Sequence, residues 1–260
     1  MKNNSEKNSE NNPENNLDKN SDNDISDRTS VGPGLVTPIT RTHIIKFICR
    51  SLIFIYLLCD YLSDGHMDTP SFMAIPVVIV FVAEVISRFF PTVKLNSIGA
   101  LKHLEKSYQE KEKGAAPHVE GVKGALIIAI IWIFYNGLLI GLTRAHILDQ
   151  GIMILLSGFY AVCDMICVLF WCPLQLYFMK NRCCVTCRIY NWDYIMMVTP
   201  LIAINSIYSV IMVVAALALF LHWEINYKRH PERYAKNTNG CLDCKNCNEK
   251  ICAFKLRKLH

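Results

Sequence analysis

The amino-acid sequence predicts an all-α integral membrane protein, a polytopic transmembrane helix bundle, and three observations lead to this fold class. Of the 260 residues, 52% are hydrophobic and 19% are charged, with a mean hydropathy of +0.23. The apolar residues are concentrated in five long segments, each near or above the roughly 20 residues that a membrane-spanning helix needs. The polar and cysteine-rich sequences lie mainly at the two ends of the chain, outside these segments.

Residues 1–42 form an Asn-rich acidic arm that we expect to be disordered. Residues 1–40 hold 4 Lys and Arg against 7 Asp and Glu, and nine Asn lie among the first 23 positions. Such a stretch buries too little apolar surface to offset the entropy that it would lose on ordering. Because no apolar core of seven residues follows Met1, the sequence predicts no cleavable signal peptide.

The five apolar segments form a transmembrane helical domain over residues 43–223. They are residues 43–62, 71–90, 124–142, 151–179 and 194–223. The first segment contains Lys46 and Arg50, whose long side chains can reach the membrane interface. The last segment is interrupted by Pro200 and Asn205, so it is the best candidate for a re-entrant half-helix followed by a full span.

Residues 94–113, between the second and third segments, have the pattern of an amphipathic helix. Apolar side chains recur at three- and four-residue steps from Ile98 to Tyr108, with Lys and Glu between them. Such a helix either lies on the membrane surface or is a solvated connector, and the sequence leaves both interpretations open.

The distribution of basic residues places three segments in the cytosol, but five simple crossings cannot bring them to one side. The segments are the loop at 94–123 with six Lys, the loop at 180–193, and the tail at 224–260 with 9 Lys and Arg against 4 Asp and Glu. Basic loops mark the cytosolic face of a membrane protein. We therefore expect a multi-pass protein of the cell membrane with a cytosolic tail, and a re-entrant 194–223 would restore the parity.

The tail carries the motif C-x2-C-x2-C-x4-C, which predicts a metal site formed by Cys241, Cys244, Cys247 and Cys252. Four thiolates at such spacing can converge on one ion, as in structural zinc sites. The first three also resemble the run around an iron–sulfur cluster, although four residues instead of three precede the last cysteine and Ala253 replaces the usual Pro. Zinc and an iron–sulfur cluster are both expected cofactors, with a redox pair, disulfides or incidental thiols as alternatives.

Three possible additional thiols, Cys183, Cys184 and Cys187, lie between Arg182 and Arg188. Nearby cations lower the pKa of a thiol, which favours the thiolate and therefore reactivity or metal binding. If this loop and the tail lie on the same face of the membrane, seven cysteines share that face.

Asp164, deep in the fourth segment, is the predicted intramembrane polar site. An ionisable group at such depth usually faces a partner inside the bundle, and we expect Asn136 or Asn205 to supply it. The functional interpretation is a proton or cation site. The alternative is one structural contact between helices, worth about 0.6 kcal/mol.

Two further patterns concern helix packing. Glu84 and Arg88 are four residues apart, which predicts an ion pair within one helix. Gly137 and Gly141 form a G-x-x-x-G motif, which predicts a face where another helix can approach closely.

The stretches WCPLQLYFMKNRCC, CRIYNWDYIMMVTPLI and HPERYAKNTNGCLDCKNCNEKIC resemble an uncharacterised family of multi-pass membrane proteins from clostridial bacteria with a Cys-rich C-terminal tail. The resemblance covers about the C-terminal third of the chain. It implies a bacterial plasma membrane, and because the family has no assigned activity, it implies no mechanism.

The expected function is that of an integral membrane protein whose four-cysteine tail binds a metal or an iron–sulfur cluster in a redox or metal-sensing role. The alternatives are a small transporter or transporter subunit with a structural zinc tail, and a membrane thiol–disulfide oxidoreductase. No phosphate loop, H-E-x-x-H or G-x-S-x-G motif occurs in the sequence, so no enzyme class follows from it. The expected partners are the lipid bilayer and a redox partner or a second copy, and no nucleic acid, because the basic residues flank a membrane span.

Overall fold

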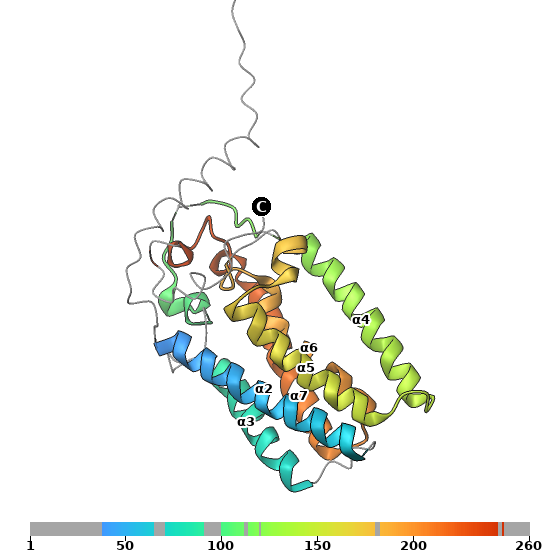
Figure 1. The fold of residues 1–260 in the computed structure, drawn as a ribbon. Coiled ribbons are helices and arrows are strands. Elements are labelled where there is room, and N and C mark those ends of the chain that lie inside the picture. The colour runs from blue at the N-terminus through green and yellow to red at the C-terminus, as the bar shows by residue number, and fades with distance from the viewer. Residues whose placement is uncertain are drawn as a thin grey trace, which may run out of the picture. The chain divides into compact units, whose positions relative to one another are not determined.

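The computed structural model describes residues 38–64, 71–90, 100–111, 114–119, 121–179, 183–243 and 246, and these residues are arranged as an all-helical bundle (Figure 1). Its long helices are α2 (Pro38–Asp64), α3 (Ser71–Phe89), α4 (Val122–Arg144), α5 (Gln150–Leu169) and α7 (Ile207–Arg229). Within the described residues, α2, α4, α5 and α7 are long and apolar enough to cross a membrane. Most of the predicted disordered arm lies outside the described residues, but its last positions, 38–42, belong to α2.

The fourth predicted segment, 151–179, is divided in the structure. The side chain of Asp149 caps the start of α5 by accepting a hydrogen bond of 2.9 Å from Gly151 N. The helix ends at Leu169, and a π-helical turn, η3 (Leu174–Met179), follows Pro173. Because proline lacks an N–H and restricts the residue before it, a straight α-helix does not continue through this point.

The fifth predicted segment, 194–223, is also interrupted, at the positions that the sequence indicated. A short helix α6 (Asp193–Val198) continues into the 3-10 turn η5 (Thr199–Ala203), and α7 begins only at Ile207. The guanidinium of Arg144 donates to Asn205 Oδ1 at 3.1 Å and to the Ile202 carbonyl at 3.2 Å. The bond to Ile202 satisfies a backbone carbonyl that the interruption of the helix leaves without a helical partner.

The bundle has two ends, which we call the distal end and the tail end. At the distal end, Gly151 lies against the Tyr61 ring and Arg144 binds Asn205. The tail end comprises the segments around His103, residues 183–192 and residues 230–243, which contact one another. Residues 193–206 therefore lead from the tail end to the distal end, and α7 returns. This hairpin brings the described parts of all three basic segments to the tail end.

The predicted amphipathic helix at 94–113 is not a continuous helix in its described part. Residues 100–111 form two short 3-10 turns, η1 (Ala100–His103) and η2 (Glu105–Ser107), and then an extended stretch. Lys111 N donates to the Thr238 carbonyl at 3.0 Å, and Gly240 N donates to the Gln109 carbonyl at 2.8 Å. The backbone of this stretch pairs with the tail, so it does not form hydrogen bonds along a helix.

The core lies around the short helix α6. Val198 is fully buried, and Phe81 of α3, Tyr194 of α6 and Leu219 of α7 belong to the same cluster. Large apolar side chains remain exposed along the outer surface, for example Phe134 of α4 at 74%. An apolar exterior of this kind suits lipid rather than water.

Candidate functional site

Six charged side chains form a network inside the bundle, between α2, α3, α5 and α6. Each side chain is only 5% to 19% exposed. The network contains three cations and three carboxylates, so it is formally neutral, and its members are Lys46, Arg50, Glu84, Arg88, Asp164 and Asp193.

Arg50 of α2 is the central residue of this network. Its Nη1 lies 2.9 Å from Asp164 Oδ2 on α5, and its Nη2 lies 2.9 Å from Glu84 Oε2 on α3. The same Nη1 also donates to the Ala161 carbonyl at 3.2 Å. Lys46, one helical turn before Arg50, lies 3.0 Å from the other Glu84 oxygen. One guanidinium thus ties three helices together.

Arg88 and Asp193 form the second part of the network. Arg88 Nη1 donates to Asp193 Oδ1 at 3.0 Å, while the 2.7 Å contact from Nη2 to Oδ2 is an ion pair without hydrogen-bond geometry. The guanidinium lies 4.9 Å from the ring centre of Tyr190 and 4.7 Å from that of Tyr194. The Tyr194 hydroxyl donates to Glu84 Oε2 at 2.9 Å, which joins the two parts.

The network differs from the polar contacts that the sequence suggested. Asp164 pairs with Arg50, whereas the expected partners are engaged elsewhere, Asn136 with Tyr160 and Asn205 with Arg144. The sequence offered one indication of the true partner, the cations inside the first apolar segment, which were interpreted as reaching the interface.

Glu84 and Arg88 do not pair with each other, contrary to the expectation from their spacing. Glu84 binds the cations of α2, and Arg88 binds Asp193 of α6. Both side chains find opposite charges on neighbouring helices, and those contacts replace the pair within α3.

The network lies well inside the bundle. Arg50, Glu84 and Asp164 are each about 13 or 14 residues from the distal end of their helices, which is about 20 Å at the helical rise of 1.5 Å per residue.

The cysteine motif of the tail is only partly described. Cys241 lies in the turn η7 (Gly240–Leu242) and is partly buried, while Cys244, Cys247 and Cys252 lie outside the described residues. Among the residues that the structure does describe, no group of three or more His, Cys, Asp or Glu could hold a metal ion. The predicted tail site therefore stays a prediction.

The start of the motif lies beside the second cysteine loop. Leu242 is buried in one cluster with Val185, Met165 and Val168, and the partly buried Cys183 packs against this cluster. The described part of the tail and the loop with Cys183, Cys184 and Cys187 thus share the tail end of the bundle.

Asn239, which the sequence did not single out, holds the tail in place. It is 0% exposed, and its Nδ2 donates to the carbonyls of Lys102 at 3.1 Å and Arg233 at 2.9 Å. Its Oδ1 accepts from Cys241 N at 3.0 Å and from Gln109 N at 3.4 Å. These contacts order Cys241 through protein groups alone.

The loop thiols lie in an environment that opposes the expected fall in pKa. Cys184 and Cys187 are buried, and burial raises the pKa of Cys187 to about 11. Arg188 does not offset this effect, because its guanidinium binds Glu224 at 2.6 Å and lies over the Tyr227 ring. A thiol of this kind is a poor nucleophile at neutral pH, which gives no support to the thiol–disulfide alternative.

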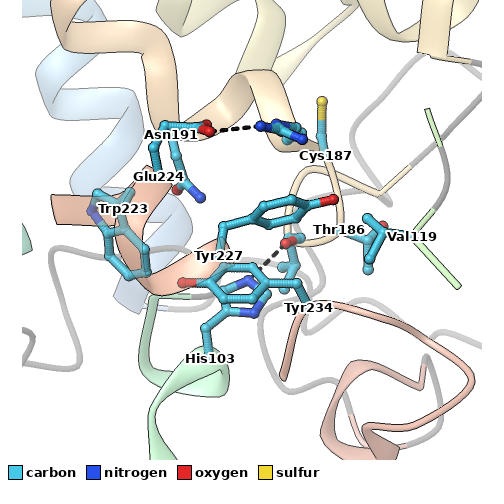
Figure 2. Close-up of a pocket in the computed structure, with 11 residues that line it drawn as sticks. His103, Val119, Thr186, Cys187, Asn191, Trp223, Glu224, Tyr227 and Tyr234 are labelled. Atoms are coloured by element: carbon cyan, nitrogen blue, oxygen red, sulfur yellow. Dashed lines mark hydrogen bonds and ion pairs between the residues drawn. The ribbon is translucent and has the colours of Figure 1, made fainter. Parts of the chain in front are cut away.

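A cleft of about 370 Å³, including its open mouth, lies at the tail end (Figure 2). Figure 2 shows His103 and Tyr234 at one side of it, with Trp223 and Glu224 on another side and Cys187 opposite them. The His103 ring stacks on Tyr234 with 4.4 Å between ring centres. Its two nitrogens lie 3.2 Å from the Arg233 carbonyl and 3.0 Å from the Val185 carbonyl. Burial lowers the pKa of His103. This histidine connects all three segments of the tail end.

Gly137 and Gly141 do not pack closely against any other helix in the described part of the chain. A Cβ built at either position has nothing within 4 Å among the described residues. The helix α4 instead makes its contacts through other positions, including Asn136.

Comparisons with protein-family models, with curated proteins and with solved structures found no match. The resemblance to the clostridial membrane proteins therefore stays a prediction. The charge network and the ordered tail end are the features from which a function can be argued.

Proposed function

We propose that the chain crosses the bilayer six times and that its tail end faces the cytosol. The path of residues 193–206 from the tail end to the distal end supports a short, interrupted crossing before α7. Arg144 donates to the backbone carbonyl of Ile202 beside the break, and non-helical backbone is tolerated in a membrane only where protein or water satisfies it. Gathering of the three basic segments at the tail end supports the cytosolic assignment.

The protein functions, on this proposal, as a small transporter that moves a proton or small cation with a solute. The observation that carries the proposal is the contact of Arg50 with carboxylates on two other helices, deep in the bundle. Charged side chains at such depth are costly to insert, about 2.5 to 3.5 kcal/mol each on insertion scales. Buried ion pairs are also often no more stable than apolar groups of similar size. A transport role accounts for such costly groups better than stability does.

The arrangement of the pairs supports a mechanism. The cations Lys46 and Arg50 lie on α2, while Glu84 and Asp164 come from α3 and α5. A proton or cation that neutralises Asp164 releases it from Arg50 and weakens the contact between α2 and α5. The same exchange at Glu84 weakens the contact between α2 and α3. The occupancy of the carboxylates thereby changes helix packing.

Proton flux into proteoliposomes tests this function. The purified protein is reconstituted into liposomes that contain a pH-sensitive dye. A pH gradient, acidic outside, is then imposed, and potassium with valinomycin clamps the membrane potential. Wild type should acidify the interior faster than empty liposomes, and Asp164→Asn should reduce the rate to that of empty liposomes. Asp60→Asn, near the distal end of α2, is the matched control and should behave as wild type. Because coupled transport needs both substrates, the rates are compared without and with acetamide on the side from which protons enter. A wild-type rate equal to that of empty liposomes under both conditions would refute the proposal.

Removal of the pair as a unit separates transport from a structural role. The double variant with Arg50→Met and Asp164→Leu leaves no unpaired charge at this place, because Glu84 retains Lys46 as its partner. Replacing a buried ion pair by apolar groups of similar size is often neutral for stability. If the network only holds helices together, this variant retains both thermal stability and flux, whereas the transport proposal expects stability without flux.

A second candidate function is metal sensing or redox sensing by the four-cysteine tail. The observation that favours it is Asn239, which orders Cys241 beside the Cys183 loop. Zinc or an iron–sulfur cluster at this position would connect to the bundle through Leu242, and a redox partner or a second copy would dock at the same end. A purely structural zinc would instead leave the transport function to the helices.

Metal analysis of anaerobically purified protein tests the second candidate. Iron with labile sulfide and a broad visible band near roughly 400 nm, lost in Cys244→Ser, would support redox sensing. About one zinc per chain without colour would support a structural or zinc-sensing tail. Cys59→Ser, an exposed cysteine of α2, is the control and should keep the metal. Absence of metal from wild type would remove this candidate.

A further inference from the structure

Asn136 is a fully buried amide on a helix whose exterior is apolar. It is 0% exposed and lies near the middle of α4, whereas Phe134, two positions before it, is among the most exposed residues. Its Nδ2 donates to the carbonyl of Trp132 on its own helix at 3.1 Å. Its Oδ1 accepts from the Tyr160 hydroxyl of α5 only at 3.5 Å, which is long for a hydrogen bond. The amide therefore retains unused hydrogen-bonding capacity.

Trp132 adds a second unused donor at the same place. Its Nε1 is buried and has no hydrogen-bond partner among the described residues. The ring lies 4.6 Å from the Tyr160 ring, centre to centre, with the two planes tilted by 52°. A buried donor without a partner is rare in proteins and calls for an explanation such as a bound water or ligand.

The three side chains lie next to the charge network. Tyr160 precedes Asp164 by one helical turn on α5, so the two side chains are neighbours along the helix surface. Tyr160 faces α4 through Asn136, while Asp164 faces α2 through Arg50. A solute held between α4 and α5 would thus lie within one turn of the carboxylate that exchanges its partner.

We infer that Trp132, Asn136 and Tyr160 form a binding site for a small solute that presents an oxygen acceptor, either a carbonyl or a carboxylate. The unused groups are donors, the indole N–H of Trp132 and an amide N–H of Asn136, and donors recognise acceptors. In the interior of a membrane there is no bulk water to satisfy them, so an acceptor gains more there than at a wet surface. The inference rests on the proposed transport function and assigns a solute class to it.

Binding measured without transport tests the inference. Thermal unfolding of the detergent-purified protein is followed with sodium acetate as the carboxylate probe, acetamide as the carbonyl probe, and methylammonium chloride as a probe without an oxygen. Wild type should show a saturable rise in Tm with acetate or acetamide, and which one acts identifies the source of the oxygen. Methylammonium should give no saturable rise.

Two substitutions locate the binding site, and one control accompanies them. Trp132→Phe keeps an aromatic ring but removes the indole N–H. Asn136→Leu keeps the approximate size of the side chain but removes the amide. Each should raise the apparent Kd by about three- to tenfold, as expected for one lost hydrogen bond. Tyr135→Phe, a half-exposed neighbour on α4, should bind as wild type. No saturable effect in wild type, or equal effects in all variants, would mean that the site holds water only and would overturn the inference.

The two proposals fail in distinguishable ways. Proton flux without any probe binding would leave the transport function and remove the solute site. Binding that depends on Trp132, without proton flux, would retain a ligand site and remove transport as its purpose.

Discussion

Arg50 and Asp164 form a 2.9 Å ion pair between α2 and α5, although 114 residues separate them in the chain. The same guanidinium holds Glu84 of α3, so the relative positions of three helices depend on one side chain. The members of the network should therefore contribute unequally to the stability of the fold, and single substitutions can test this.

Removal of Arg50 should destabilise the fold much more than removal of Lys46. Arg50→Gln leaves Asp164 buried without its ion-pair partner, and breaking a buried pair in this way costs about 3 to 5 kcal/mol. Lys46→Gln leaves Glu84 still paired with Arg50 and able to accept from the new amide, so it should cost less, about 1 to 2 kcal/mol. Unfolding by sodium dodecyl sulfate in mixed micelles measures both. Equal losses would show that Arg50 is not central to the network.

The proposed six crossings predict which positions share a side of the membrane. Lys123→Cys, at the start of α4, and Arg229→Cys, at the end of α7, should react from the cytosolic side with a membrane-impermeant maleimide. Ala145→Cys, in the turn after α4, should react only from the opposite side. Intact cells and inverted vesicles compared in a background without reactive cysteines provide the measurement. Labelling of Lys123→Cys and Arg229→Cys from opposite sides would contradict an even number of crossings.

His103 should make the stability of the tail end depend on pH. Burial lowers the pKa of His103 in the folded protein below its ordinary value of about 6.5, so the unfolded chain binds a proton more readily. The contribution of His103 is therefore complete above about pH 6.5 and is lost as the pH falls toward the lower pKa of the folded state.

Hydrogen exchange of residues 233–243 measures this dependence. Protection in wild type should decrease between about pH 7.5 and 5.5, after correction for the intrinsic exchange rate. His103→Gln should have lower protection at high pH and a flatter dependence. His118→Gln, an exposed histidine of the same end, should retain the wild-type profile. A wild-type profile independent of pH would exclude a role for His103 protonation.

Asn239 should control the order of the cysteine tail. Asn239→Ala removes the acceptor of Cys241 N and leaves the buried carbonyls of Lys102 and Arg233 without this donor, which costs about 1 to 3 kcal/mol. If the tail binds zinc, the affinity should fall about 10- to 100-fold, as for other groups that orient ligands. Asn237→Ala, whose bonds to Ala116 and His118 are exposed, is the matched control and should have a smaller effect. Isothermal titration with zinc gives both affinities.

Local features of the fold were predictable because they depend on neighbouring residues. The apolar runs predicted where the long helices form, since a span depends only on length and hydropathy. The bounds of the fourth and fifth segments were wrong by ten or more residues, because α5 ends at Leu169 and α7 begins only at Ile207. Pro200 and Asn205 indicated the interruption before α7, because proline and polar residues act on the adjacent backbone. Among the residues that the structure describes, four helices are long and apolar enough to cross a membrane, which agrees with the multi-pass assignment in its general form.

The errors arose where distant segments compete with local pattern. The spacing from Ile98 to Tyr108 fits an amphipathic helix, but the backbone at 109–111 pairs with residues 238–240 of the tail. Glu84 and Arg88 have helical spacing for a pair. Each instead pairs with an opposite charge on another helix, Glu84 with Arg50 and Arg88 with Asp193.

The sequence by itself determined that long apolar helices form, that the last apolar segment is interrupted, and which residues carry charge or thiols. Only the tertiary structure decided which charges meet. The sequence offers several possible partners of opposite charge for each of Lys46, Arg50, Asp164 and Asp193, and does not distinguish among them. It also decided that the tail begins beside the Cys183 loop, through the buried side chain of Leu242. The physical reason is that helix formation is a property of consecutive residues, whereas the pairing of buried polar groups depends on which helices pack together.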